Sequence, residues 1–191
     1  MSRPCLLKVN SCPKWVEEKK LRGVFIIRDP RDVAVSLCHY IMREPRHWCH
    51  TFFREVLSDD SSRLMATICG MDEPHLDSID KHFRRKFGYL SHPQFCIVRF
   101  EELIGSAGGG DDRSQQVTIQ KIADHLQLSL TAQELRHITS RAFWRNSPTF
   151  RKGQIGAWKQ EMQEEHKEAF GKVAGQLLLE LGYEEGLERM C

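Results

Sequence analysis

The sequence has no long apolar run, no paired cysteine motif and almost no excess of charge, and each absence narrows the class of protein. No stretch is apolar for long enough to cross a bilayer, and no secretory segment precedes Cys5. The seven cysteines are odd in number and lack C-x-x-C spacing, which favours reduced thiols over a disulfide framework. A net charge of +2 does not favour general nucleic-acid binding. We therefore expect a cytoplasmic protein that binds neither membranes nor nucleic acid.

Length and composition predict one globular domain over residues 1–191. The chain has 191 residues, of which 40% are hydrophobic, enough for a sizeable single core. Because the overall charge is small, affinity for an anion must come from local clusters of cations.

One such cluster lies in the ten residues from Phe150 to Lys159, which contain three cations, two glycines and a tryptophan. Gly153 and Gly156 would let the backbone approach an anion closely, and Arg151 offers a planar set of donors to phosphate oxygens. The segment is typical of a phosphate-binding loop. A basic, solvated loop leading into a helix explains the same composition equally well.

A second segment, Val24 to Ser36, reads as strand, charged turn and helix. Pro30 suits the first turn of a helix, whose unpaired N–H groups and positive dipole end would face the carboxyl end of the strand. Anions bind at that place in open α/β sheets. Arg28 would lie at the strand end, and Ser36 could add a hydroxyl donor from the helix. The alternative for Arg28 is an ion pair with Asp29 or Asp32.

Together these two segments resemble the cytosolic-type sulfotransferase family. The family motif R-[ND]-P-x-D-x-x-x-S is matched from Arg28 to Ser36, and its motif R-K-G-x-x-G-x-W-K from Arg151 to Lys159. In that family both motifs hold the 3′-phosphate of the co-substrate 3′-phosphoadenosine 5′-phosphosulfate (PAPS), with no metal. The resemblance therefore implies a cofactor-binding set made of Arg28, Ser36, Arg151, Lys152 and Gly153.

A third segment, Phe95 to Leu103, resembles the family's strand ending in Y-E-D-L, in which the aromatic residue lies near the adenine. Here Phe100 replaces the tyrosine. Stacking on the adenine could survive this change, but a phenolic hydrogen bond could not.

Two departures from the family pattern concern its catalytic chemistry. The loop P-K-[ST]-G-[ST]-[ST]-W, which holds the 5′-phosphosulfate, is not found in the sequence. The family's K-x-H segment aligns with Lys8 and Asn10, so an amide occupies the position of the catalytic base. An amide cannot take a proton near neutral pH, whereas imidazole can. Either Asn10 positions the substrate, another group acts as base, or the chain does not catalyse transfer.

The resemblance implies an α/β fold: a three-layer sandwich with a parallel sheet flanked by helices, similar to a P-loop sulfotransferase core and incomplete at its N-terminus. It implies transfer of a sulfuryl group from PAPS to a hydroxyl or amine of a small molecule, with Lys8 near the phosphosulfate. The alternative is a non-catalytic nucleotide-binding or interaction protein that keeps only the 3′-phosphate site. The acceptor cannot be read from the sequence.

Coarse periodicity gives the expected elements. Strands are predicted at Cys5–Val9, Val24–Arg28 and Phe95–Phe100, and a helix at Pro30–Arg43. Residues 46–90 are expected to be mostly helical and, by the resemblance, to cover the acceptor site. Ile79, Phe83 and Phe87 share a helical face there, for which core packing is the favoured interpretation.

The second half of the chain is expected to be scaffold. Gly105–Asp112 is predicted to be a flexible loop, and Thr131–Glu134 a capping box that opens a helix. One amphipathic stripe is predicted at Val117, Ile122, Ala123 and Leu126. A final helix is expected to begin near Trp158 and to end at Gly182, with its buried face formed by Trp158, Met162, Phe170, Val173, Leu177 and Leu181.

Histidine and cysteine are dense between Cys38 and His50, but the spacing fits no standard zinc module, and no metal site is predicted. The nine histidines likewise do not indicate a hydrolase triad.

Overall fold

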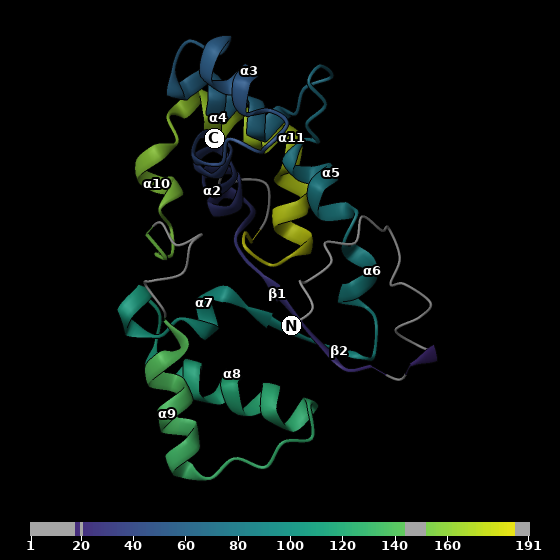
Figure 1. Ribbon diagram of the computed structural model, residues 1–191, viewed down its shortest axis with the longest axis vertical. Coiled ribbons are helices and arrows are strands. Elements are labelled where there is room, and N and C mark those ends of the chain that lie inside the picture. Colours follow the sequence, from purple (N-terminus) through teal and green to yellow (C-terminus); the bar gives the residue numbers. More distant parts are fainter. Residues whose placement is uncertain (1–17, 20, 144–151, 186–191) are drawn as a thin grey trace.

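A two-stranded parallel sheet lies at the centre of the computed structural model, which describes residues 18–19, 21–143 and 152–185 (Figure 1). Strand β1 is Gly23–Ile27 and β2 is Phe95–Arg99, paired from Gly23 opposite Phe95 to Ile27 opposite Arg99. Both predicted strands are confirmed, and each ends one residue earlier than expected: Phe100 already belongs to α7, and Arg28 directly precedes the N-cap residue of α2. The strand expected at Cys5–Val9 lies outside the described residues.

Helices make up most of the rest. Their bounds are α2 Pro30–Arg43, α3 His50–Glu55, α4 Asp60–Cys69, α5 Ile79–Arg84, α6 Phe87–Leu90, α7 Phe100–Leu103, the 3-10 helix η1 Ser106–Gly108, α8 Asp112–His125, α9 Ala132–Ala142, α10 Trp158–Glu161 and α11 Glu164–Glu180. The helix predicted at Pro30–Arg43 is confirmed, as is the helical character of residues 46–90.

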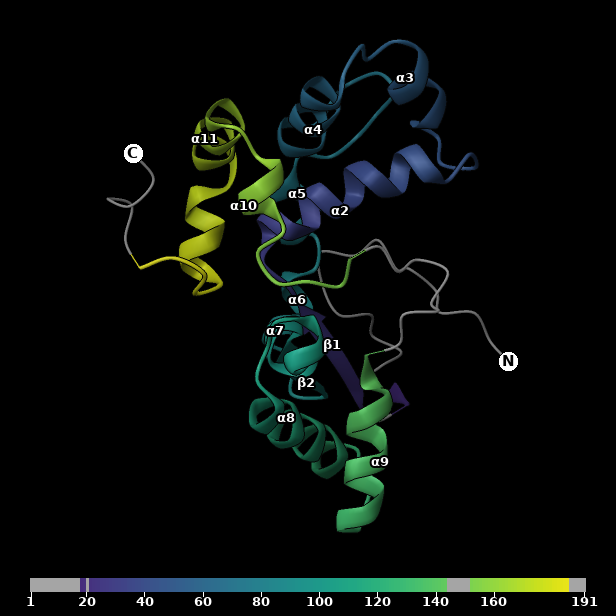
Figure 2. The same cartoon turned by 90° about the vertical axis from the view of Figure 1, so that its left-hand side faces the viewer.

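The sheet is flanked by helices, as predicted. In Figures 1 and 2, α8 and α9 lie on one side of the strands, and α2, α4 and α11 form a group on the other. Helices α7 and α8 contact β2, whereas α4 packs between α2 and α11. Strand β1 ends shortly before α2 begins, and β2 is parallel to β1, so the carboxyl ends of both strands point toward the start of α2.

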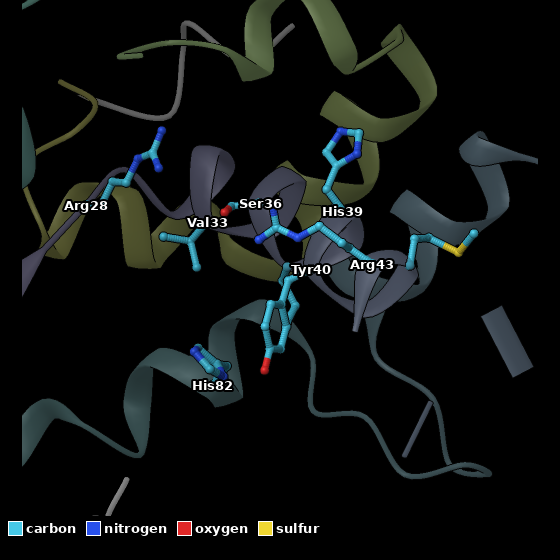
Figure 3. Close-up of a pocket in the computed structure, with 9 residues that line it drawn as sticks. Arg28, Val33, Ser36, His39, Tyr40, Arg43 and His82 are labelled. Carbon is cyan, nitrogen blue, oxygen red and sulfur yellow. The ribbon is translucent and has the colours of Figure 1, made fainter. Parts of the chain in front are cut away.

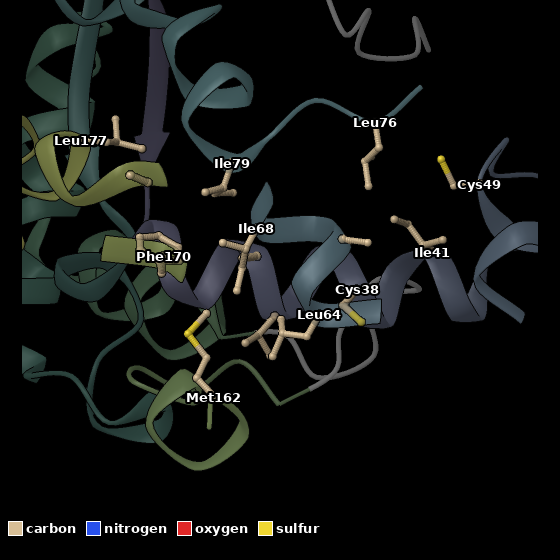
Figure 4. Close-up of a cluster of buried hydrophobic side chains, with 14 of the residues drawn as sticks. Cys38, Ile41, Cys49, Leu64, Ile68, Leu76, Ile79, Met162, Phe170 and Leu177 are labelled. Atoms are coloured by element: carbon tan, nitrogen blue, oxygen red, sulfur yellow. The ribbon is translucent and has the colours of Figure 1, made fainter. Parts of the chain in front are cut away.

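The main hydrophobic core holds α2, α4 and α11 together (Figure 4). Ile41 of α2, Ile68 of α4 and Phe170 and Leu177 of α11 are fully buried in it. Ile79 is buried, and Phe83 and Phe87 are partly buried against the same core, which confirms core packing for this face. This core fixes the orientation of α2 and with it the residues at its N-terminus.

The final helix is not continuous, and the prediction of one helix from Trp158 onward was wrong. At Met162 the backbone is extended (φ −87°, ψ 121°), which separates α10 from α11. Gln163 and His166 form a reciprocal cap that starts α11 afresh. Met162 is nevertheless buried, and Trp158 packs partly against the core, so the apolar spacing reflected burial and not one helix.

Gly182 ends α11, as predicted. Its φ is +66°, its N–H donates to the carbonyl of Leu179 at 3.0 Å, and the N–H of Tyr183 donates to that of Leu178 at 2.8 Å. This is the Schellman arrangement, in which a left-handed residue satisfies the last carbonyls of a helix.

Replacing Gly182 with alanine is expected to lower the free energy of unfolding by about 1 kcal/mol, because a Cβ disfavours positive φ. Chemical denaturation measures the change. Gly109→Ala is an informative comparison, since φ is +89° there but no atom lies within 4 Å of the added Cβ. A larger loss at Gly182 than at Gly109 would show that crowding by Arg99, 3.1 Å from that Cβ, adds to the strain.

The scaffold predictions for residues 105–142 hold in part. The capping box of Thr131 and Glu134 opens α9. Ala123 of the predicted stripe is buried, but Val117 is 62% exposed, and the other buried residues of α8 are Gln115, Thr118 and Ile119. The stripe was displaced because two polar side chains are buried on this helix, one of which, Gln115, donates to the carbonyl of Leu103.

The glycine-rich segment Gly105–Asp112, for which a flexible loop was predicted, contains η1 and is closed by hydrogen bonds. Asp112 accepts from both the N–H and the hydroxyl of Ser106, at 2.8 and 3.0 Å. The carbonyl of Gly108 accepts from the N–H of Ile155 at 3.2 Å, so this turn supports the segment that carries Gly153.

Candidate phosphate site

Arg28 lies at the carboxyl end of β1 and contacts both predicted motif segments. Its Nη2 donates to the carbonyl of Gln154 at 2.8 Å and to Oδ2 of Asp32 at 3.2 Å. Its guanidinium carbon is 4.4 Å from the ring centroid of Phe100, and its Nε is buried without a hydrogen-bond partner. The sequence offered two alternatives for Arg28, an ion pair or a place in an anion site. Arg28 does pair with Asp32, and this contact does not prevent its other N–H groups from binding an anion.

Asp32 joins the start of α2 to the segment after Gly153. Its side chain is fully buried; Oδ2 accepts from the N–H of Gly156 at 2.9 Å, and Oδ1 accepts from that of Trp158 at 3.0 Å. With Arg28 this gives one carboxylate three donors, which offset part of the cost of burying its charge. Two sequence segments 124 residues apart are thereby brought together.

The local backbone explains why these residues gather here. Asp29 caps α2 by accepting from the N–H of Arg31 at 2.9 Å, and its own N–H donates to Glu101 at 3.0 Å. Glycine permits positive φ at Gly153 (58°) and Gly156 (72°), so the chain folds back over the first turn of α2.

A network of charged side chains on the other side of α2 holds the C-terminal segment in place. The guanidinium of Arg31 pairs with Asp29 and Glu184 and stacks on Trp158, 4.1 Å from the ring centroid. Tyr183 donates to Glu101 at 3.0 Å, and its burial, together with the carboxylate, raises the pKa of the phenol above its usual value. These contacts could not be predicted from the sequence, because they depend on where α11 ends.

Ser36 lines a cleft with Arg28, and Lys152 is bound to Glu161, which also contacts His39 of that cleft. Ser36 lies on α2, one turn beyond Asp32, and lines a cleft of about 730 Å³ together with Arg28 and His39 (Figure 3). Nζ of Lys152 donates to Oε1 of Glu161 at 2.9 Å, and the other oxygen of that carboxylate contacts His39. The acid keeps the lysine near the cleft, a contact that sequence reasoning missed.

Of the residues predicted for the site, Arg28 and Ser36 line one cleft and Phe100 packs against Arg28. Gly153 precedes Gln154, whose carbonyl Arg28 contacts, and Lys152 is bound to Glu161. Lys8, Asn10 and Arg151 lie outside the described residues. The cysteines and histidines between Cys38 and His50 have separate surroundings: Cys38 and Cys49 are buried, and His50 contacts the carbonyl of Ile41. In the described ranges no three potential ligands gather as a metal site would require, and none of the helices there is long and apolar enough to cross a membrane.

A parallel sheet flanked by helices, with cations gathered where a strand runs into a helix, defines a P-loop-like α/β protein. A model of the family described as "Sulfotransferase domain" matches residues 1–182, and the chain belongs to this family.

Two solved structures are similar in fold. Mouse sulfotransferase SULT7A1 complexed with PAP has a TM-score of 0.68 and 17% identity, over 90% of this chain and 64% of that one. Retinol dehydratase in complex with androsterone and inactive cofactor PAP has a TM-score of 0.61 and 18% identity, over 85% of this chain and 49% of that one. The chain thus spans less than two thirds of either neighbour's length. A search of curated proteins gave no match.

Proposed function

We propose that this chain binds PAPS through its 3′-phosphate and transfers the sulfuryl group to a hydroxyl or amine of a small molecule. The observation that carries the proposal is the junction at Asp32, which holds Arg28 and the backbone after Gly153 against each other. Family membership and the PAP present in both structural neighbours support it.

The residues present suit a phosphate group. Arg28 is already oriented by Gln154 and Asp32, so a phosphate needs little reorganisation to accept from its remaining N–H groups. Ser36 supplies a hydroxyl, Lys152 an ammonium and Gly153 a backbone N–H, and Arg151 completes the proposed set. Phe100, packed beneath Arg28, is the proposed neighbour of the adenine.

The donor, when bound, supplies an activated sulfuryl group: its sulfur–oxygen bond to the 5′-phosphate breaks, the nucleotide keeping the electron pair, as the acceptor oxygen bonds to sulfur and releases a proton. Lys8 is proposed to lie near the phosphosulfate. Asn10 can orient the acceptor by hydrogen bonds but cannot accept its proton, so the proton passes to water or to another group.

A second function, nucleotide binding without transfer, is favoured by one observation: Asn10 stands where the family carries its base. The two candidates share the phosphate site and differ only in turnover. A transfer assay with labelled PAPS and a panel of phenols, alcohols and amines separates them, because binding of adenosine 3′,5′-bisphosphate with no labelled product supports the second.

Calorimetry with adenosine 3′,5′-bisphosphate tests the site shared by both functions. Arg28→Ala is expected to weaken binding by about 10- to 100-fold, since a hydrogen bond to a charged group contributes about 1.5–3 kcal/mol. Ser36→Ala removes only a hydroxyl and is expected to cost about three- to tenfold.

Arg54→Ala is the matched control, because it removes an exposed cation from α3 and should leave the affinity unchanged. Thermal melts of each variant show whether folding is retained. Equal affinity for wild type and Arg28→Ala would refute the assignment of the site.

A further inference from the structure

Lys86 and His82 form an unusual contact at the corner between α5 and α6. Nζ of Lys86 donates to Nε2 of His82 at 2.5 Å. The nearby acid Asp77 is already paired with Lys81 and Arg85. Over the described ranges, no carboxylate lies within ion-pair distance of Lys86. This half-buried ammonium has an imidazole as its hydrogen-bond partner, which leaves two of its three donors for water or a ligand.

The surroundings of the pair keep the imidazole neutral. Burial first, and then the charge of Lys86, lower the pKa of His82 to about 4, with Asp77 opposing and Arg85 adding to the shift. Burial also lowers the pKa of Lys86. At neutral pH His82 therefore accepts a hydrogen bond and does not neutralise the lysine. An anion beside Lys86 would offset the cost of burying its charge.

A cavity lies beside this pair. It has a volume of about 130 Å³, and Lys86, His82 and Arg28 are its cationic or basic lining residues. Its other walls are apolar: Phe25, Ile26, Ile27, Val33, Phe83, Phe87 and Leu90. The cavity shares Arg28, Val33 and His82 with the larger cleft that contains Ser36, so the two adjoin. In Figure 3, His82 lies across from the side of α2 that carries Tyr40.

Apolar walls with one charged corner suit an amphipathic anion. A neutral phenol could contact the apolar walls but would not offset the charge of Lys86. A carboxylate can accept two charge-assisted hydrogen bonds, and its hydrocarbon body can cover Phe83 and Phe87.

We propose that Lys86, positioned by His82, binds the carboxylate of an amphipathic hydroxy acid, and that such acids are the acceptors of this chain. The role as acceptor rests on the proposed function, whereas the carboxylate site does not. If the proposed function holds, this site would make the chain prefer acceptors that carry a carboxylate over neutral ones.

Two probes that differ only in charge test this inference: 4-hydroxyphenylacetate and its neutral amide, 4-hydroxyphenylacetamide. Each is titrated into the full chain by calorimetry, with and without saturating adenosine 3′,5′-bisphosphate. Wild type is expected to bind the carboxylate about tenfold more tightly than the amide, the effect of one charge-assisted hydrogen bond. Lys86→Met, which keeps the aliphatic stem, is expected to abolish that preference.

Lys81→Met is the matched control. It removes a lysine of α5 whose ammonium pairs with Asp77 and whose side chain is 58% exposed. It should keep the preference. Should Lys86→Met fail to fold, Lys86→Gln retains a donor for His82 and serves the same test. Equal binding of the two probes by wild type, no binding of either, or a preference that survives loss of Lys86 would overturn the proposal.

The nucleotide titration separates this inference from the proposed function. Binding of the carboxylate through Lys86 without binding of the nucleotide would support the anion site and refute the phosphate site. Binding of the nucleotide with no preference between the two probes would support the phosphate site and refute the anion site at Lys86.

Discussion

Asp32→Ala is expected to lower the free energy of unfolding by about 3–5 kcal/mol, the usual cost of removing one partner from a buried ion pair. The carboxylate accepts from Arg28, Gly156 and Trp158. Its loss leaves two backbone N–H groups without their acceptor, and Arg28 keeps only the carbonyl of Gln154. Because typical domains have only about 5–15 kcal/mol of stability, this is among the largest effects a single substitution can have here.

Urea denaturation of wild type and variant measures this loss, and Asp60→Ala is its control. Asp60 pairs with Arg63 but its side chain is 96% exposed, so its removal should cost less than about 1 kcal/mol. Asp32→Asn keeps the shape and one acceptor oxygen, and we expect an intermediate loss. A change at Asp32 no larger than that at Asp60 would mean that the two motif segments are joined by other contacts.

Asp32→Ala should also weaken binding of adenosine 3′,5′-bisphosphate more than its lost stability explains. At low temperature, where the variant remains folded, calorimetry is expected to show an affinity about tenfold or more below wild type, because Arg28 and Gly153 lose their fixed separation. Unchanged affinity in the folded variant would separate the stabilising role of Asp32 from the proposed site.

The residues of the candidate site could be predicted because each belongs to a short pattern with a local physical meaning. Strand, Pro30 and helix fix where Arg28 lies, and the two glycines indicate a backbone that turns sharply. The role of Asp32 could not be inferred in the same way. It depends on a contact with Gly156 that only the folded chain creates, so the sequence suggested a simple ion pair with Arg28.

The fold shows the same division between local and tertiary causes. The ends of α2 and α9 follow from their caps, which involve residues a few positions apart. The break at Met162 was missed because apolar spacing continues across it and because its reciprocal cap, although local, uses Gln163 and His166 in place of the usual S/T-x-x-E/Q pattern. Val117 was misplaced for a related reason: polar Gln115 and Thr118 occupy the buried face of α8.

The pair of Lys86 and His82 was also hidden from the sequence. A run of basic residues from Lys81 to Lys86 is most simply a solvated face, and three of its members do pair with Asp77, Asp80 or Glu180 at the surface. Of the lysines and arginines in this run, Lys86 alone lines the cavity beside β1, together with His82. Its distinct role follows from the corner between α5 and α6, where the helix direction changes.

Phe170→Ala is expected to lower the free energy of unfolding by about 3–5 kcal/mol, the range for truncating a fully buried aromatic side chain. Phe170 is 0% exposed and lies in the core shared by α2, α4 and α11 (Figure 4). The rings and chains around it can close only part of the cavity, so both transfer energy and packing are lost. Urea denaturation measures the change, with Val117→Ala as a control that should cost about 0.5 kcal/mol or less because that side chain is 62% exposed.

This substitution distinguishes scaffold from site when it is compared with Asp32→Ala. Among the described residues, Phe170 does not line the cleft of Arg28 and Ser36, so the folded fraction of Phe170→Ala should bind adenosine 3′,5′-bisphosphate within about twofold of wild type, as expected for independent sites. The nucleotide should also raise its melting temperature, since a ligand that binds only the folded state stabilises it by mass action. If affinity instead fell with stability in both variants, α2 would be held in position chiefly by the core, and the junction at Asp32 would be secondary.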